Sequence, residues 1–147
     1  MSNKDNPIIG AEFQEQVRKW FEDHYDKPFV SEKKIAIGIY PDNKKDHKFD
    51  IVAEDETVAI ECKRYTWTAS GNVPSAKMGF TNEATLYLSL LPDTYEKYIV
   101  MLYSYNAKRG ETLAEYYYRT NNHLLGEIKI AEYNPETNEL RVISEAV

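Results

Sequence analysis

The sequence predicts an α/β domain, residues 1–147, in which helices cover both faces of a central mixed sheet. Apolar residues recur at helical spacing over 8–25, as in an amphipathic helix that packs on a sheet. The stretch 49–63 alternates apolar and polar residues on both sides of an acidic turn, which indicates two paired strands. The nearly continuous apolar run 97–105 is typical of a strand that is covered on both faces. A chain of 147 residues is expected to form one domain with one core.

The first half of the chain supplies a helix and three strands. The expected elements are a helix over 8–25, with Phe13, Val17, Trp20 and Phe21 on its apolar face, and a strand over 34–40, with Ile35, Ile37 and Ile39 on its apolar face. A turn signal at 41–43 and a charged connection at 44–48 lead into the two strands of 49–63.

The second half adds two helices, one strand and a closing hairpin. The helix over 75–91 buries Ala84, Leu88 and Leu91, while Glu83 faces either the site described below or the solvent. After the strand at 97–105 come a helix over 112–125, ended by Gly126, and a hairpin formed by 127–133 and 139–143. The order is an αβββαβ core followed by a helix and a β-hairpin.

Two acidic residues are expected to face each other within 49–63. A two-residue turn at Asp55-Glu56 sets Asp50 opposite Glu61, with Lys63 on the same face, whereas a turn of another length or a bulge moves Asp50 to the other face. Like charges about 5 Å apart repel by roughly 3 kcal/mol at an effective dielectric of ~20. A divalent cation removes that repulsion, so the pattern predicts a metal site.

The acid-x-Lys tripeptide carries little information by itself. It begins at Glu32, Asp42, Asp46, Glu61 and Glu127. The copy at Glu61 stands out because it ends an apolar strand that directly follows an acid-bearing partner strand. The copy at Glu127 is also strand-like, but no earlier acid pairs with it, and it is interpreted as a solvated strand face.

The hairpin resembles the PD-(D/E)xK nuclease superfamily, whose members share the restriction-endonuclease-like fold, a three-layer α/β/α sandwich. The resemblance lies in F-D50-I-V and A-I-E61-C-K63, with ten residues between Asp50 and Glu61, and residues 10–17 look like the first helix of that superfamily. It covers about residues 8–103. It implies that Asp50, Glu61 and the backbone carbonyl of Cys62 hold Mg²⁺, for which Mn²⁺ can substitute. It also implies that Lys63 orients the attacking water or stabilises charge on the phosphate.

Two positions depart from that family pattern. Phe49 stands where the motif has proline, which is a common variation. Gln14 stands where the first helix of many relatives carries glutamate, and Glu12 and Glu15 are the candidates to replace it. Acids near the start of a helix also suit its dipole, so a purely structural role remains open for them.

The segment after Lys63 leaves the end of the motif-bearing strand and is expected to lie near the substrate. Its candidate nucleic-acid contacts are Arg64, Trp67, Asn72, Ser75 and Lys77. Packing of Trp67 on the core and an N-cap role for Ser75 are the structural alternatives.

Composition excludes several classes of protein. A net charge of −6 argues against a general nucleic-acid coat protein but not against a nuclease, because carboxylates that await a cation count as negative. One cysteine cannot form an internal disulfide, and no apolar run is long enough to span a membrane or resembles a signal segment. The expected location is therefore the cytoplasm, with no membrane partner.

The resemblance implies a Mg²⁺-dependent nuclease that hydrolyses phosphodiester bonds, with DNA preferred to RNA. A restriction-type endonuclease and a Holliday-junction-resolvase-like enzyme are the leading candidates. The alternative is a catalytically inactive protein of the same fold that binds nucleic acid or another protein. Enzymes that cut both strands often act as dimers, and the tyrosine-rich segment 116–118 is a candidate homodimer surface.

Overall fold

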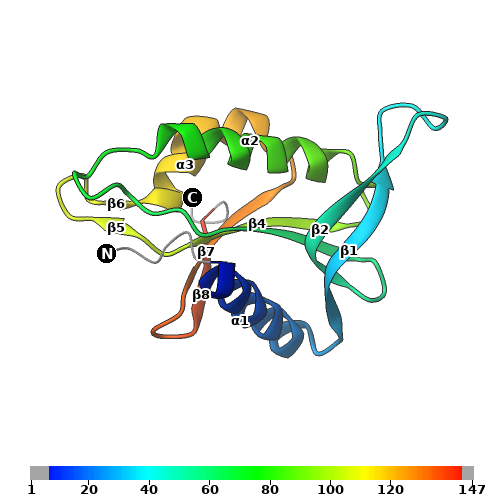
Figure 1. Cartoon of the computed structure of the whole chain (residues 1–147), viewed down its shortest axis with the longest axis horizontal. Coiled ribbons are helices and arrows are strands. Elements are labelled where there is room, and N and C mark those ends of the chain that lie inside the picture. The colour runs from blue at the N-terminus through cyan, green and yellow to red at the C-terminus, as the bar shows by residue number, and fades with distance from the viewer. Residues whose placement is uncertain (1–6, 144–147) are drawn as a thin grey trace.

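The computed structural model describes residues 7–143, which form a six-stranded mixed sheet with helices on both faces (Figure 1). The helices are α1 (Pro7–Tyr25), α2 (Ser75–Ser89) and α3 (Leu113–Asn121), with a 3₁₀ turn at Asn122–Leu124. The main strands are β1 (Phe29–Ile37), β2 (Lys45–Ala53), β3 (Val58–Lys63), β4 (Glu96–Leu102), β7 (Lys129–Asn134) and β8 (Glu139–Val142). Strands β5 (Tyr105–Asn106) and β6 (Glu111–Thr112) form a separate small sheet. The predicted α/β class is confirmed.

The strand order of the sheet is β1-β2-β3-β4-β7-β8. Strand β2 is antiparallel to both β1 and β3, whereas β3, β4 and β7 run parallel to one another, and β8 is antiparallel to β7. The C-terminal ends of the three parallel strands therefore meet at one edge, where ligands of open α/β sheets commonly bind. Among residues 7–143 no helix combines the length and the apolar character that a membrane crossing requires.

Each face of the sheet has its own apolar cluster. Helix α1 places Phe13, Val17 and Phe21 against one face. Helices α2 and α3 cover the other, with Leu88 and Leu113 fully buried. Burying a side chain of this size contributes about 1.5–3 kcal/mol relative to leaving it exposed, so α1 is held firmly against the strands of the hairpin.

The first two strands are longer than the sequence predicts, and both begin earlier in the chain. Strand β1 begins at Phe29 and ends at Ile37, and β2 begins at Lys45, inside the stretch expected to be a charged connection. Ile39, expected on the apolar face of a strand, is 76% exposed at the tip of the hairpin. The chain turns at residues 39–43, and Gly38 lies so close to the returning strand that a Cβ on it would lie 2.7 Å from the carbonyl oxygen of Asn43.

The alternation of faces along β2 breaks at Asp50. Phe49 lies in the cluster under α2 and α3, whereas Ile51 lies in the cluster under α1, so the expectation that they share a face is wrong. On β1 the residue opposite Asp50 in register is Glu32, whose φ of +60° rotates that strand at the same level. Both strands change face at this level, and on β2 the side chains on either side of it, Phe49 and Ile51, stay buried.

The tyrosine-rich part of α3 contributes to the core. Tyr117 is fully buried, and its hydroxyl donates to Oδ1 of Asn82 at 2.8 Å. Tyr116 packs edge-on against Trp67, with 5.6 Å between ring centroids. Tyr117 is therefore not available to the dimer surface expected at 116–118.

Helix α3 begins with a capping box that can be tested. The Thr112 hydroxyl accepts from the Glu115 N–H at 3.1 Å, and the Glu115 carboxylate accepts from the Thr112 N–H at 2.7 Å. Thr112→Ala is expected to lower stability by about 1 kcal/mol, and hence the midpoint of thermal unfolding by roughly 2–4 °C. The matched control is Thr120→Ala near the end of the same helix, where no cap is lost. Equal midpoints for the two variants would contradict the cap's contribution.

Candidate functional site

Asp50 and Glu61 lie side by side where β2 and β3 separate. The pairs Ile51↔Ile60 and Val52↔Ala59 have the expected register, and the next step along it places Asp50 opposite Glu61. Oε2 of Glu61 accepts from the Asp50 N–H at 3.1 Å, and Oδ2 of Asp50 accepts from the Cys62 N–H at 2.8 Å. The two carboxylates thus bridge the strands with side-chain to backbone hydrogen bonds.

Both carboxyl groups of this pair have raised pKa values. Burial and, next, the charge of Glu61 raise the pKa of Asp50 from 3.8 to about 7, although the Cys62 N–H opposes the rise. Burial also raises the pKa of Glu61, which is 5% exposed, while its hydrogen bonds with Asp50 and the charge of Lys63 oppose that rise. Two acids that resist ionisation in one small volume form a site that a cation would relieve.

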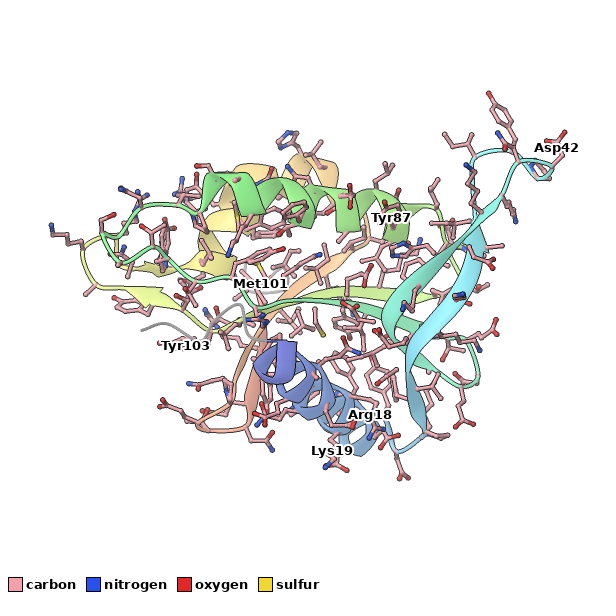
Figure 2. All side chains as sticks on the ribbon, viewed as in Figure 1. Arg18, Lys19, Asp42, Tyr87, Met101 and Tyr103 are labelled. Carbon is pink, nitrogen blue, oxygen red and sulfur yellow. The ribbon has the colours of Figure 1, made fainter. Side chains whose placement is uncertain are left out.

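His47 completes the pair, and the sequence analysis did not assign it to the site. Its Nε2 lies 2.8 Å from Oε1 of Glu61, and its ring stacks on that of Tyr87 of α2 at 3.9 Å between centroids. Figure 2 labels Tyr87 on its helix. Burial lowers the pKa of His47, which favours the neutral ring that donates Nε2–H to the carboxylate. Glu83, one turn before Tyr87, is exposed to solvent, and its charge acts on His47.

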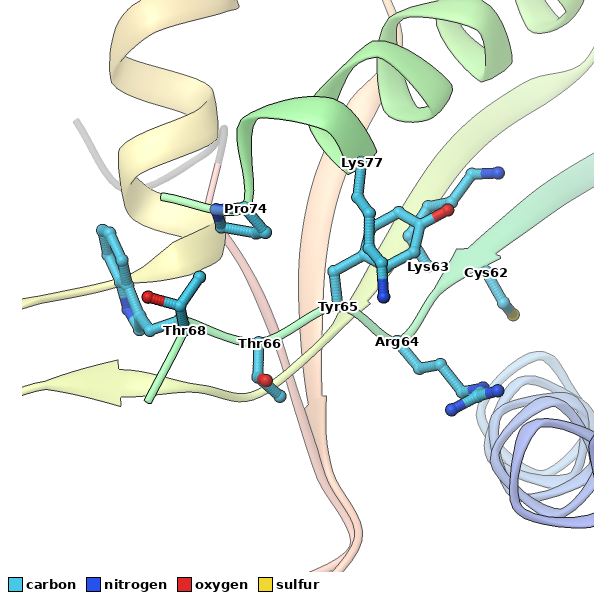
Figure 3. Close-up of a pocket in the computed structure, with 9 residues that line it drawn as sticks. Cys62, Lys63, Arg64, Tyr65, Thr66, Thr68, Pro74 and Lys77 are labelled. Atoms are coloured by element: carbon cyan, nitrogen blue, oxygen red, sulfur yellow. The ribbon is translucent and has the colours of Figure 1, made fainter. Parts of the chain in front are cut away.

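Lys63 lies on β3 two residues beyond Glu61. Residues two apart along a strand lie on the same face, and the charge of Lys63 lowers the pKa of both Asp50 and Glu61. Lys63 also lines a cavity of about 400 Å³ at the C-terminal end of β3, together with Arg64 and Lys77 (Figure 3). The side chain of Cys62 packs on the α1 side of the sheet, away from Glu61.

The candidate nucleic-acid contacts divide into two groups. Arg64, Trp67 and Lys77 line the cavity, whereas Asn72 and Ser75 are exposed residues outside its lining. Trp67 is 6% exposed and donates Nε1–H to the Ser104 carbonyl at 3.0 Å, so it packs on the core, in line with the structural alternative.

Two details of this segment bear on the roles expected for Ser75 and Trp67. Pro74, not Ser75, occupies the N-cap of α2, without a side-chain hydrogen bond. The guanidinium group of Arg109 lies 4.8 Å from the centroid of the Trp67 ring. A base could stack on Trp67 only after Arg109 moved.

The three candidates on α1 lie in different environments. Gln14 donates to the Asp50 carbonyl at 3.1 Å and to Oε2 of Glu32 at 3.2 Å, so it is the helix residue nearest the pair. Glu15 is paired with Arg18 at 2.7 Å, and Glu12 is exposed. The carboxylate that Gln14 contacts belongs to Glu32 of β1. Glu32 begins one of the acid-x-Lys tripeptides that were expected to carry no information about the site.

The donor set fits a hard divalent cation. Two carboxylates and a backbone carbonyl are oxygen ligands of the kind that Mg²⁺ prefers, with water completing its shell. Within residues 7–143 no three side chains of the His, Cys, Asp and Glu types form a ready group for a metal ion, so main chain and water would have to supply the remaining ligands. A comparison of the chain with models of known families, with curated proteins and with solved structures finds no match in any of the three.

Proposed function

We propose that the chain is a metal-dependent nuclease that hydrolyses phosphodiester bonds, with DNA as the preferred substrate. The observation that carries the proposal is the buried pair Asp50 and Glu61, held on adjacent strands, with Lys63 two residues beyond Glu61 on β3. A fold needs no such concentration of charge, whereas cleavage of a phosphodiester needs both negative ligands and a positive group. The proposal includes the restriction-endonuclease-like fold, whose αβββαβ order and helix-covered sheet agree with the elements described here.

The residues would divide the work as follows. Asp50, Glu61 and the Cys62 carbonyl would hold Mg²⁺, and Mn²⁺ could replace it. The bound ion supplies Lewis acidity and lowers the pKa of a coordinated water. Lys63 would hold the attacking water or offset the negative charge that develops on the phosphate. His47 and the Asp50 N–H fix the two oxygens of Glu61, and Gln14 fixes the carbonyl of Asp50, so the pair is held in place before substrate arrives.

The test is cleavage of defined nucleic acids. Purified protein is incubated with supercoiled plasmid, branched DNA and RNA, each with Mg²⁺, with Mn²⁺ and with EDTA. The proposal expects cleavage in either metal, none in EDTA, and faster cleavage of DNA than of RNA. Cleavage that persists in EDTA, or no cleavage of any of the three substrates, would reject it.

A catalytically inactive protein of the same fold is the second candidate. It is favoured by the hydrogen bonds that already engage both oxygens of Glu61 and by Gln14, an amide where an acid would add a ligand. Binding of nucleic acid without cleavage, unchanged by Glu61→Ala, would select this function. Titration calorimetry with Mn²⁺ separates the two further, because only the nuclease requires metal binding that Glu61→Ala removes.

A further inference from the structure

The outer halves of β1 and β2 form a two-stranded arm that projects beyond the body of the molecule, past the end of α2 (Figure 1). The arm comprises residues 33–48, paired in one register from Lys33↔Phe49 to Ile37↔Lys45. Asp42 marks its outer end (Figure 2). Because β2 also carries His47 and Asp50, the arm is a rigid extension of the strand that forms the candidate site.

The arm is basic although the chain is acidic. It carries five lysines, Lys33, Lys34, Lys44, Lys45 and Lys48, and two aspartates, Asp42 and Asp46, within a chain of net charge −6. Lys34 lies directly opposite Lys48, a like-charge pair that destabilises a sheet unless an anion lies nearby. Lys48 has a long contact to Glu32 at 3.7 Å, and Lys33 pairs with Glu56 at 3.0 Å. No ion pair within residues 7–143 involves Lys34, Lys44 or Lys45.

The tip of the arm, residues 39–43, exposes two apolar side chains beside Asp42 and is closed by a backbone hydrogen bond. Ile39 is 76% exposed and Tyr40 is 65% exposed. The Asn43 N–H donates to the Tyr40 carbonyl at 3.1 Å, and the close approach of Gly38 to Asn43 leaves no room for a side chain. An exposed apolar tip on a basic ribbon matches the chemistry of the wedges that enter the minor groove of DNA, where lysines bind phosphates and the apolar residue separates two base steps.

We propose that this arm binds duplex DNA beside the candidate site, with its lysines on the phosphates and with Ile39 and Tyr40 wedged into the groove. This inference deepens the proposed function, on which it rests for the location of the scissile phosphate, and it assigns double-stranded DNA as the substrate class. Five residues of strand separate Asp50 from Lys45, or about 17 Å, and the tip lies farther out. Ile39 lies two residues beyond Ile37, the partner of Lys45, so at ~3.4 Å per base pair the wedge would act about seven base pairs from the cleaved bond.

The experiment measures binding in EDTA, where no cleavage occurs. Fluorescence anisotropy gives the affinity for a 30-base-pair DNA duplex and for one of its single strands, and energy transfer between dyes at the duplex ends reports bending. The variants are Ile39→Ser with Tyr40→Ala at the tip, and Lys34→Ala on the shaft. The matched controls are Phe80→Ala, an exposed aromatic of α2, and Lys19→Ala, an exposed lysine of α1. All of these side chains lie at or near the surface, so circular dichroism should show intact folds.

The tip variant is expected to bind duplex about tenfold more weakly or worse and to lose the bending signal, whereas the controls stay within about twofold of wild type. Lys34→Ala is expected to lower the slope of log affinity against log salt by about 1. Unchanged duplex affinity in the tip variant, or equal losses on duplex and single strand, would overturn the inference. So would self-association of the protein in the absence of DNA that depends on Ile39 and Tyr40.

The outcome is separable from that of the proposed function. Glu61→Ala retains the whole arm and is expected to bind duplex as the wild type does. Suppose that wild type and Glu61→Ala both show tip-dependent binding but wild type cleaves nothing in Mg²⁺ or Mn²⁺. DNA binding by the arm is then supported and the proposed nuclease activity is rejected. If wild type cleaves DNA and the tip variant binds and bends duplex as wild type does, the nuclease activity is supported and DNA binding by the arm is rejected.

Discussion

Replacing Lys63 or Glu61 by alanine is expected to lower the rate of metal-dependent DNA cleavage by at least 10²–10³-fold, about 3–4 kcal/mol in transition-state free energy. Loss of Lys63 removes the positive charge that acts on both Asp50 and Glu61. Loss of Glu61 removes half of the carboxylate pair. The measurement is the initial rate of plasmid nicking in Mg²⁺ and in Mn²⁺ at saturating metal.

The chain provides its own controls for this experiment. Glu127 and Lys129 form the same acid-x-Lys tripeptide at the start of β7, and Glu127 is exposed. Glu127→Ala and Lys129→Ala make the same chemical changes away from the pair and are expected to leave the rate within about twofold, as surface substitutions usually do. Purified Lys63→Ala that cleaves as fast as wild type would reject the catalytic assignment of Lys63.

Local pattern was enough to predict the hairpin and its register. The acidic turn between two alternating stretches fixed the pairing of Ile51 with Ile60, and that pairing placed Asp50 beside Glu61. The boundaries of α2 and the order of the elements also follow from apolar periodicity, because each helix must bury one face against the sheet. These features depend on neighbours in sequence, which a single chain displays.

The features that sequence did not predict depend on contacts between distant segments. His47 was assigned to a connection because the charged residues of 44–48 obscure the strand pattern. In the structure His47 and Phe49 share a face of β2, with 4.5 Å between their ring centroids. Continuing the alternation two residues back from Phe49 would have found it. The change of face at Asp50 coincides with the positive φ of Glu32 on the neighbouring strand, which no residue preference in the sequence indicates. Ile39 is exposed because β1 ends at Ile37 and the chain turns at residues 39–43, so the prediction of a strand to residue 40 is wrong.

Asp50→Asn is expected to make the metal-free protein more stable than wild type at pH 8 and above, and to remove the stabilisation by Mg²⁺. The asparagine keeps an oxygen that can accept from the Cys62 N–H, so the strand junction is preserved. It removes a carboxylate whose pKa is raised by burial and by the charge of Glu61 to about 7 in the folded chain, against 3.8 without those influences.

The direction of the pH dependence follows from proton binding. The folded chain holds the Asp50 proton more tightly than the unfolded chain does, so between pH ~4 and pH ~7 stability falls as pH rises, and the loss is complete above pH ~7. At 1.36 kcal/mol per pKa unit the loss is at most about 4 kcal/mol, and relaxation around the charge reduces it to about 1–3 kcal/mol. The variant is therefore expected to unfold several degrees higher than wild type at pH 8.5, with the difference vanishing near pH 4.

Thermal unfolding followed by circular dichroism across pH 4–9, with EDTA and with 10 mM Mg²⁺, measures both effects. The control is Asp46→Asn, which changes an exposed carboxylate on the same strand and is expected to alter neither the pH profile nor the response to metal. Mg²⁺ should raise the wild-type midpoint most at high pH, because Asp50 is then ionised and binding stabilises only the folded chain. A buried acid pair that served only to join β2 and β3 would give the opposite result: Asp50→Asn would be neutral or destabilising at every pH, and Mg²⁺ would leave the wild-type midpoint unchanged.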